Sequence, residues 1–348
     1  MNYSIGKYKV VHLIPYDGVG GVETAARSMS DACHEEIQFQ VNHIFKNINQ
    51  KKDLWWTFNP LSLITAAWRC SRKDVDLLIV SLWRSAIVGW LAKQIRPNIK
   101  LVAFLHCSED KHSFDKFATR LVVSTATEIW ADSQATIKLR VPGLSANKSR
   151  VISFVTRRFE YSPQRKVEPS FIFWGRVTPQ KAVGRAIRLF AAIHKNCPAA
   201  RFWIIGPDGG DLDSLHALCD SLSLQDAVVF LGTKTHDEIA GFVCQASFYL
   251  QTSVYEGMAM SVVESMQMGL VPAVTAVGEI GAYCRDGYNA VLIKSDQQAI
   301  EDIEQLLNSD DRYQALRTNA IATWKEFPLY RDSIISACEE LFKHYEQL

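Results

Sequence analysis

The 348-residue sequence has few of the features of secreted or membrane-spanning proteins. Its eight cysteines are scattered, without a C-x-x-C pair, which argues against a disulfide framework and a structural zinc site. The N-terminus has no apolar core of a signal peptide, and the most apolar segment, residues 75–92, is interrupted by Asp76 and Arg84. We therefore expect a cytoplasmic protein with reduced thiols, no signal peptide and no membrane span.

The chain also has almost no net charge, but its two halves differ in sign. Residues 1–165 contain 23 Lys and Arg against 14 Asp and Glu, whereas residues 166–348 contain 15 against 23. A basic half suits an anionic partner such as a phospholipid surface or a lipid-linked phosphate. Nucleic acid would fit on charge alone, but the motifs described below favour a different ligand, and we expect no nucleic-acid partner. The length is comfortable for two domains.

Short β-branched runs alternate with helical patterns along the whole chain. This alternation predicts parallel, doubly wound sheets, whose ligands bind beyond the carboxyl ends of the strands. A polar stretch at residues 154–170 is typical of a linker. In the first half we expect strands at 9–15, 41–45, 77–81, 101–106, 129–132 and 150–154, and helices at 22–33, 61–71, 86–95, 114–124 and 133–141. In the second half we expect strands at 171–174, 201–205, 228–231, 248–251 and 271–275, and helices at 236–243, 297–308, 311–325 and 330–345.

The segment from Ser253 to Gly269 combines two carboxylates with a helix start. Glu256 is followed by Gly257 and a run of helix formers, and Glu264 lies about two helical turns further on. The backbone N–H groups of Gly257, Met258, Ala259, Met260 and Ser261 would project from the first turn, where a phosphate can bind. Carboxylates do not bind phosphate, so the expected partners of Glu256 and Glu264 are the hydroxyls of an attached sugar or ribose.

Two cations follow the first strand of the second half. Arg176 comes directly after Gly175, and Lys181 lies five residues later, before a predicted helix. Such a pair can neutralise a diphosphate, the arginine through its planar fork and the lysine as a point charge. The glycine-rich loop at residues 16–23 permits close approach of a ligand, but Glu23 stands where a dinucleotide-binding loop has its third glycine, so a dehydrogenase is disfavoured.

Together these motifs resemble the signature of retaining GT-B glycosyltransferases of glycosyltransferase family 4. The resemblance rests on Gly175-Arg176 with Lys181, on Glu256-Gly257 with Glu264, and on Met266, Gly269 and Pro272. It implies an α/β protein with two Rossmann-like domains facing across a cleft: an acceptor-binding domain at 1–160, a nucleotide-sugar-binding domain at 170–325, and a helix at 326–348 that crosses back. The sequence departs from the family at Ser153-Phe154-Val155, at Ala182 and at Ala282.

The resemblance also implies roles for residues that the pattern alone does not assign. Gly20 and Gly21 would close over the donor phosphates, His106 would lie against the donor sugar, and Gly206 and Thr233 would lie beside the nucleotide. We thus expect retaining, metal-independent transfer of a sugar from a nucleotide-diphospho-sugar to a glycan or lipid-linked glycan in polysaccharide biosynthesis, with no cofactor. The alternatives are a sugar-nucleotide epimerase on the same fold and a non-catalytic subunit that binds a glycan or a partner enzyme. The expected catalytic residues are His106, Glu256, Arg176 and Lys181.

Two further patterns allow more than one interpretation. The D-x-D sequences at Asp74–Asp76 and Asp211–Asp213 hold a metal in a different glycosyltransferase fold, but here they precede a strand and begin a helix, so we expect no metal site. The stretch Lys51–Lys73 contains Trp55, Trp56 and Trp68 among basic residues. It suits peripheral contact with an anionic membrane, and equally an amphipathic helix packed on its own sheet.

Overall fold

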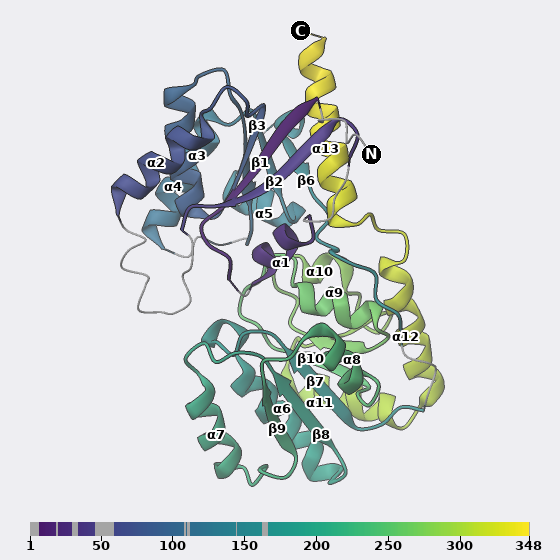
Figure 1. The fold of residues 1–348 in the computed structure, drawn as a ribbon. Coiled ribbons are helices and arrows are strands. Elements are labelled where there is room, and N and C mark those ends of the chain that lie inside the picture. The colour runs from purple at the N-terminus through teal and green to yellow at the C-terminus, as the bar shows by residue number, and fades with distance from the viewer. Residues whose placement is uncertain are drawn as a thin grey trace. The chain divides into compact units, whose positions relative to one another are not determined.

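The computed structural model describes residues 7–18, 20–29, 34–45, 59–107, 109, 112–143, 145–161 and 166–347. The chain forms two compact units. Unit 1 consists of residues 1–157 and 328–348, and unit 2 of residues 158–327. The expected boundaries at 160 and 325 lie within three residues of the points where the chain passes between units, whereas the expected start of the second domain at 170 lies twelve residues after the start of unit 2. Figure 1 shows both units.

Unit 1 is built on a six-stranded parallel sheet in the order β2-β1-β3-β4-β5-β6. Its central strands are near-continuous apolar runs because helices cover both faces of a parallel sheet. All five residues of β3 are buried, and β3 pairs in parallel with β1 and β4. The strands are β1 (Tyr8–Ile14), β2 (Ile37–His43), β3 (Leu77–Ser81), β4 (Lys100–Leu105), β5 (Glu128–Ala131) and β6 (Ser149–Val151).

Helices pack on unit 1's sheet according to the two-residue alternation of the strands. Leu101, Ala103 and Leu105 of β4 join a core with the neighbouring helices α2, α3 and α4, which lie side by side with α3 in the middle (Figure 1). Phe104 points to the other face. The helices of unit 1 are α1 (Gly21–Arg27), α2 (Pro60–Cys70), α3 (Trp83–Ile95), α4 (Ser113–Thr125), α5 (Gln134–Arg140) and α13 (Tyr330–Glu346).

The last helix, α13, packs within unit 1 although unit 2 precedes it in the chain. Its Tyr330 is fully buried against Phe104 and Phe154, with ring centroids 6.4 and 5.2 Å away. Near its other end Phe342 stacks on Tyr8 of β1 at 3.9 Å. The helix therefore covers the sheet face opposite α2, α3 and α4.

Unit 2 repeats the architecture with the strand order β12-β11-β10-β7-β8-β9. All described pairs are parallel. The strands are β7 (Ser170–Trp174), β8 (Arg201–Ile205), β9 (Val228–Gly232), β10 (Phe248–Gln251), β11 (Val271–Val274) and β12 (Val291–Leu292). The helices are α6 (Val183–Asn196), α7 (Leu212–Ser221), α8 (His236–Val243), α9 (Met260–Gln267), α10 (Ile280–Tyr283), α11 (Asp296–Leu307) and α12 (Asp310–Trp324).

Four expected elements differ from the structure by more than one residue at an end, and one of them is the helix expected at 86–95, which is α3 and begins at Trp83. The helix expected at 22–33 ends at Arg27, since Ser28 and Met29 form a turn, and residues 30–33 lie outside the described ones. The strand expected at 41–45 is β2, which begins four residues earlier, because I-Q-F-Q-V alternates as an edge strand does. The strand expected at 150–154 is β6, which ends at Val151. In the part of the chain that the structure describes, no helix is long and apolar enough to cross a membrane.

Candidate functional site

The strand order of unit 2 identifies where a ligand is expected to bind. From β7 the chain adds β8 and β9 on one side and β10, β11 and β12 on the other, so the direction of winding reverses between β7 and β10. Ligands of open α/β sheets bind outside the carboxyl ends of the strands at such a switch point. The loops that follow β7 and β10 hold Arg176, Lys181 and Glu256.

Lys181 and Glu256 form an ion pair at this switch point. The Lys181 Nζ lies 2.7 Å from the Glu256 Oε1, and their side chains are only 15% and 7% exposed. The same Oε1 accepts hydrogen bonds from the Ser253 Oγ at 2.6 Å and from the Gln251 Nε2 at 3.3 Å. A buried charge needs such partners. Glu256 is thus held rigidly, and Lys181 keeps N–H groups beyond the one that it gives to Glu256.

Glu264 lies in α9 with both carboxylate oxygens engaged. The Trp174 Nε1 donates a hydrogen bond to its Oε2 at 2.8 Å, and the His236 Nε2 lies 3.3 Å from its Oε1. The side chain of Glu264 is 7% exposed, whereas that of His236 is 36% exposed. Trp174 is the last residue of β7, so this bond ties α9 to the strand at the switch point.

The start of α9 presents a row of backbone donors. In the part of the chain that the structure describes, the N–H groups of residues 257–261 donate no hydrogen bond. Ala259, the residue before the helix, has a φ of 56°, a left-handed conformation that is uncommon without glycine. A Cβ at Gly278 would lie 2.3 Å from the Glu256 carbonyl oxygen, so only glycine fits there. The unpaired amides and the helix dipole together favour an anion at this position.

Several residues that hold this site were not predicted from the sequence. The buried Tyr249 hydroxyl lies 2.7 Å from both the Gln251 Oε1 and the Ser261 Oγ, and it fixes Ser261 at the helix start. Burial raises the pKa of Tyr249 well above its ordinary value, which keeps this hydroxyl protonated as a donor. Tyr249, Gln251, Ser253 and Trp174 belong to or follow apolar strands. The available signal was the polar Gln251 at the end of an otherwise apolar strand.

The other residues predicted in unit 2 lie around the same strand ends. Arg176 is exposed, and it makes no hydrogen bond or ion pair with any described residue. Gly206 has a φ of 147°, and a Cβ there would lie 1.8 Å from the Gly175 carbonyl oxygen, so the backbones after β7 and β8 cross too closely for any other residue. Thr233 is exposed directly after β9.

The residues predicted in unit 1 are His106, Gly20 and Gly21. His106 follows β4, and its Nε2 lies 2.9 Å from the Ser81 Oγ, which in turn lies 2.8 Å from the Nε2 of the buried His12. Burial lowers the pKa of His12 to about 3, so its ring is neutral at physiological pH. Gly21 begins α1, and a Cβ on Gly20 would lie 2.5 Å from the Glu23 Oε2.

The two D-x-D patterns have local structural partners. Asp76 accepts a hydrogen bond from the Lys9 backbone N–H at 2.8 Å, and Asp74 pairs with the Lys9 Nζ at 2.9 Å. Asp211 precedes α7, and Asp213 lies in its first turn. Across the described residues, no three His, Cys, Asp or Glu side chains are grouped so that they could hold a metal ion.

The chain is similar in sequence to known glycosyltransferases. Residues 156–323, which span nearly all of unit 2, match the family of glycosyl transferases group 1. The chain is 22% identical over 265 residues to the uncharacterized glycosyltransferase YqgM of Bacillus subtilis, covering 69% of this chain and 70% of that protein. It is 28% identical over 267 residues to the D-inositol 3-phosphate glycosyltransferase of Salinispora arenicola, covering 65% of this chain but only 59% of that protein. Unit 2 is thus similar to the glycosyl transferases group 1 family over nearly its whole length.

Solved structures extend the similarity in fold to both units. The chain resembles Anabaena Alr3699/HepE, crystallised with UDP and glucose, with a TM-score of 0.73 and 19% identity over 98% of this chain and all of that one. It resembles the sucrose-phosphate synthase of Thermosynechococcus elongatus with a TM-score of 0.78 and 15% identity, covering 98% of this chain and 100% of that one. The predicted fold class, two parallel-sheet Rossmann-like domains of the GT-B glycosyltransferase kind, is confirmed.

Proposed function

We propose that the protein is a glycosyltransferase that moves a sugar from a nucleotide-diphospho-sugar to a glycan or lipid-linked glycan, with retention of configuration and without a metal ion. The observation that carries the proposal is the switch point of unit 2. There Lys181 and Glu256 lie near the five backbone N–H groups of residues 257–261, which donate no hydrogen bond to any residue that the structure describes. Cationic and amide donors suit a diphosphate, and carboxylates suit hydroxyls.

Each group has a role that follows from its chemistry. Lys181 and Arg176 stabilise the charge that grows on the diphosphate as the glycosidic bond breaks, and the amides of residues 257–261 assist them. Glu256 accepts hydrogen bonds from the sugar hydroxyls while it keeps Lys181 in place. Glu264 accepts from the ribose, and Gly206 and Thr233 lie beside the nucleotide. In unit 1, Gly20 and Gly21 approach the phosphates and His106 orients the sugar. Preorganised donors of this kind commonly contribute about 10²–10³-fold to turnover.

The experiment is a panel of UDP-, GDP- and ADP-sugars tested for thermal stabilisation and for release of nucleotide diphosphate. We expect one nucleoside series to raise the melting temperature and to be hydrolysed slowly or transferred. Proton NMR of the transferred sugar then reports the anomeric configuration, which retention requires to match that of the donor. An epimerised sugar nucleotide as the product, or binding of glycans without any donor turnover, would contradict the proposal.

We further propose that unit 1 contacts an anionic membrane at the cytoplasmic face through a surface formed by α2 and α4. This α2–α4 surface consists of exposed residues of α2, of the turn after it and of α4, with α3 between the two helices: the apolar Leu61, Ile64, Trp68, Phe114 and Phe117 and the basic Arg69, Arg72, Lys73, Lys116 and Arg120. Trp68 is 66% exposed and Phe114 is 65% exposed, and large apolar side chains beside basic ones suit contact with a membrane interface. Trp55 and Trp56, which suggested membrane contact, lie outside the described residues.

Co-sedimentation with vesicles tests this surface. The protein should pellet with phosphatidylglycerol-containing vesicles more than with phosphatidylcholine alone, and added salt should release it because ions screen the basic residues. Trp68→Ser combined with Phe117→Ser should reduce binding, whereas Tyr288→Ser, an exposed aromatic of unit 2, should not. Equal pelleting of all variants, or none with either vesicle, would contradict the membrane proposal.

A further inference from the structure

Three polar side chains lie in a row across one face of the sheet of unit 1. In the register of the sheet, His12 of β1 is the partner of Ile79 in β3. Ser81 of β3 is the partner of Phe104 in β4. Because side chains of a strand alternate between the two faces, Ser81 shares a face with Ile79, and His106 shares a face with Phe104. From β1 to β4, each polar side chain of the row therefore lies two residues closer to the carboxyl ends of the strands.

Hydrogen bonds join the three side chains. The Ser81 Oγ lies 2.8 Å from the His12 Nε2 and 2.9 Å from the His106 Nε2. Ser81 is fully buried, and its hydroxyl has no further partner among the residues that the structure describes. A hydroxyl has one proton, so Ser81 donates to one of the two rings and accepts from the other. The row is thus a hydrogen-bond chain with two possible directions.

The burial of His12 decides the direction of this hydrogen-bond chain. His12 is 1% exposed, and burial lowers its pKa to about 3, so its ring carries a single proton. The His12 Nδ1 has no hydrogen-bond partner among the described residues. In protein interiors an N–H group without an acceptor is rarer than an acceptor without a donor, which places the proton of His12 on Nε2. His12 therefore donates to Ser81, and the Ser81 hydroxyl donates to His106.

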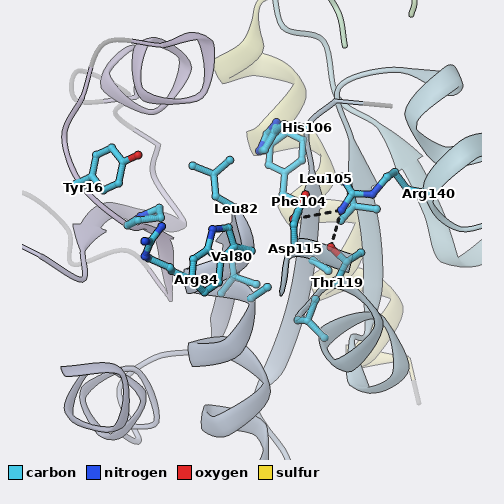
Figure 2. Close-up of a pocket in the computed structure, with 15 residues that line it drawn as sticks. Tyr16, Val80, Leu82, Arg84, Phe104, Leu105, His106, Asp115, Thr119 and Arg140 are labelled. Atoms are coloured by element: carbon cyan, nitrogen blue, oxygen red, sulfur yellow. Dashed lines mark hydrogen bonds and ion pairs between the residues drawn. The ribbon is translucent and has the colours of Figure 1, made fainter. Parts of the chain in front are cut away.

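Aromatic side chains hold the ring of His106. The ring centroid of Phe104 lies 4.3 Å from that of His106, and the ring centroid of Phe154 lies 5.3 Å from it. Figure 2 shows His106 beside Phe104 among the residues that line a pocket of about 140 Å³. The plane of the His106 ring is thus set by packing, and the position of its proton is set by the hydrogen-bond chain.

The backbone is strained directly after two members of the chain. Leu82, which follows Ser81, has φ 69° and ψ 154°, a combination that is essentially restricted to glycine. Cys107, which follows His106, has a φ of 86°. Such conformations persist where the surrounding structure requires them, and they cluster at functional sites. The strain of unit 1 is therefore located where the side chains of Ser81 and His106 meet.

We propose that Ser81 and His12 are positioning residues that fix the tautomer of His106 through this chain, in which the His12 Nε2–H donates to Ser81 and the Ser81 hydroxyl donates to the His106 Nε2. Neutral His106 then carries its proton on Nδ1 and acts toward the donor sugar as a hydrogen-bond donor. In the other tautomer Nδ1 would be an acceptor and would need a proton from the ligand. The inference rests on the proposed function only for the identity of this ligand.

NMR of the full-length protein with ¹⁵N-labelled histidine tests the direction of the chain. Long-range proton–nitrogen spectra distinguish the two tautomers of histidine, and the variants His106→Gln and His12→Gln identify the two sets of signals. The spectra are recorded without ligand at pH 8, above the ordinary histidine pKa of about 6.5. We expect the proton of His106 on Nδ1 and that of His12 on Nε2. A proton on the Nε2 of His106 would overturn the proposal.

Variants of Ser81 test whether its hydroxyl sets the tautomer. Ser81→Ala removes the donor to the His106 Nε2, so the fraction of His106 with its proton on Nδ1 should fall, whereas Ser81→Thr keeps a hydroxyl and should retain it. The matched control is Ser85→Ala, which removes another fully buried hydroxyl of unit 1, one without a partner among the described residues, and should leave the tautomer unchanged. An unchanged tautomer in Ser81→Ala would contradict the role of Ser81. If Ser81→Ala does not fold, the wild-type spectra decide.

Steady-state kinetics test the consequence for sugar transfer. Ser81→Ala should lower kcat about 10–100-fold, the loss that is common when the partner that orients a metal-binding histidine is removed. Its affinity for UDP should stay unchanged because UDP has no sugar to contact His106, and Ser81→Thr should restore most of kcat. In a His106→Gln background Ser81→Ala should have little further effect, since Ser81 acts through His106. Equal losses from Ser81→Ala in both backgrounds would show that it does not.

The two kinds of measurement separate this inference from the proposed function. A wild-type protein that turns over no sugar nucleotide contradicts the proposed glycosyltransferase activity, and the NMR spectra still decide the direction of the chain. Wild-type kcat in a folded Ser81→Ala variant of an active enzyme contradicts only the positioning role of Ser81 and His12.

Discussion

Substitutions of the ion pair between Lys181 and Glu256 should change, in opposite directions, how much a nucleoside diphosphate stabilises the protein against unfolding. Glu256→Gln should raise this stabilisation, and Lys181→Met should lower it. Glu256→Gln retains an acceptor for the Ser253 hydroxyl but leaves the Lys181 ammonium without its counter-charge. Removing one partner of a buried ion pair costs roughly 3–5 kcal/mol, and the 15% exposure of Lys181 favours the lower end. For a unit of this size each kcal/mol lowers the melting temperature by about 2–4 °C, so we expect a loss of about 6–12 °C without ligand.

A bound nucleoside diphosphate should stabilise Glu256→Gln more, and Lys181→Met less, than it stabilises the wild-type protein. In the wild-type protein the diphosphate shares Lys181 with Glu256, whereas in Glu256→Gln it supplies the missing negative charge. At 100 times its dissociation constant a ligand stabilises by about 2.7 kcal/mol, and we expect the gain from UDP to be larger than this in Glu256→Gln at the same concentration. Lys181→Met loses a charged hydrogen bond of about 1.5–3 kcal/mol, so its affinity should fall about ten- to a hundredfold and the gain at the same concentration should fall to about 0.4–1.4 kcal/mol.

Differential scanning calorimetry with and without UDP measures all of these quantities. The matched control is Lys294→Met, which removes an exposed ion pair with Asp286 in the same unit and should change stability by less than about 1 kcal/mol. If UDP stabilises Glu256→Gln less than the wild type, or Lys181→Met as much, then Lys181 does not bind the diphosphate. The assignment of the switch point as the donor site would then be wrong.

Three other predictions follow from the structure. Glu264→Ala should weaken nucleotide binding, measured by calorimetry, about ten- to a hundredfold. It should also destabilise the fold by about 1–3 kcal/mol because it leaves the Trp174 N–H without its acceptor, whereas Glu264→Gln should keep the stability of the fold. Unchanged nucleotide affinity in both variants would exclude a contact between Glu264 and the ribose. EDTA should abolish neither nucleotide binding nor transfer, since Lys181 and Arg176 supply the positive charge, and strict dependence on Mn²⁺ would contradict this. Burial lowers the pKa of His12 to about 3 from an ordinary value of 6.5, so His12 of the unfolded chain is protonated first and the stability of the fold decreases as the pH drops below 6.5. Urea unfolding should show a free energy of unfolding that is about 2 kcal/mol lower at pH 5 than at pH 7, and His12→Gln should remove this difference. An equal difference in His12→Gln would refute the assignment to His12.

The fold could be predicted from the sequence wherever burial dictates the pattern. The strands β3, β8 and β10 have the bounds that were expected, because each is a short apolar run between polar residues. The edge strand β2 was misplaced because an edge strand is only partly covered and its pattern is weaker. The helix α1 was extended too far because its apolar spacing continues past the turn at Ser28.

The structure brings Lys181 and Glu256 together, but the sequence did not predict the contacts within this group of residues. Lys181 and Glu256 were assigned to different parts of the donor, and no sequence signal indicates that two side chains 75 positions apart form an ion pair. Likewise Trp174 was expected only as the end of a buried strand, although its indole N–H holds Glu264. Such contacts depend on how β7 and β10 pair, which the local pattern does not specify. The roles of these residues toward a ligand stay predictions.

The return of α13 to unit 1 affects the order in which the protein can fold during synthesis. The stacking of Phe342 on Tyr8 and the burial of Tyr330 require residues that leave the ribosome after all of residues 158–327. At roughly 5–20 residues per second, those 170 residues take about 10–30 s to synthesise. During that time Tyr8 and Phe104 of the nascent N-terminal sheet lack the aromatic partners that α13 supplies. Unit 2 is continuous in sequence and can therefore complete its core before unit 1, whose core includes the last helix of the chain.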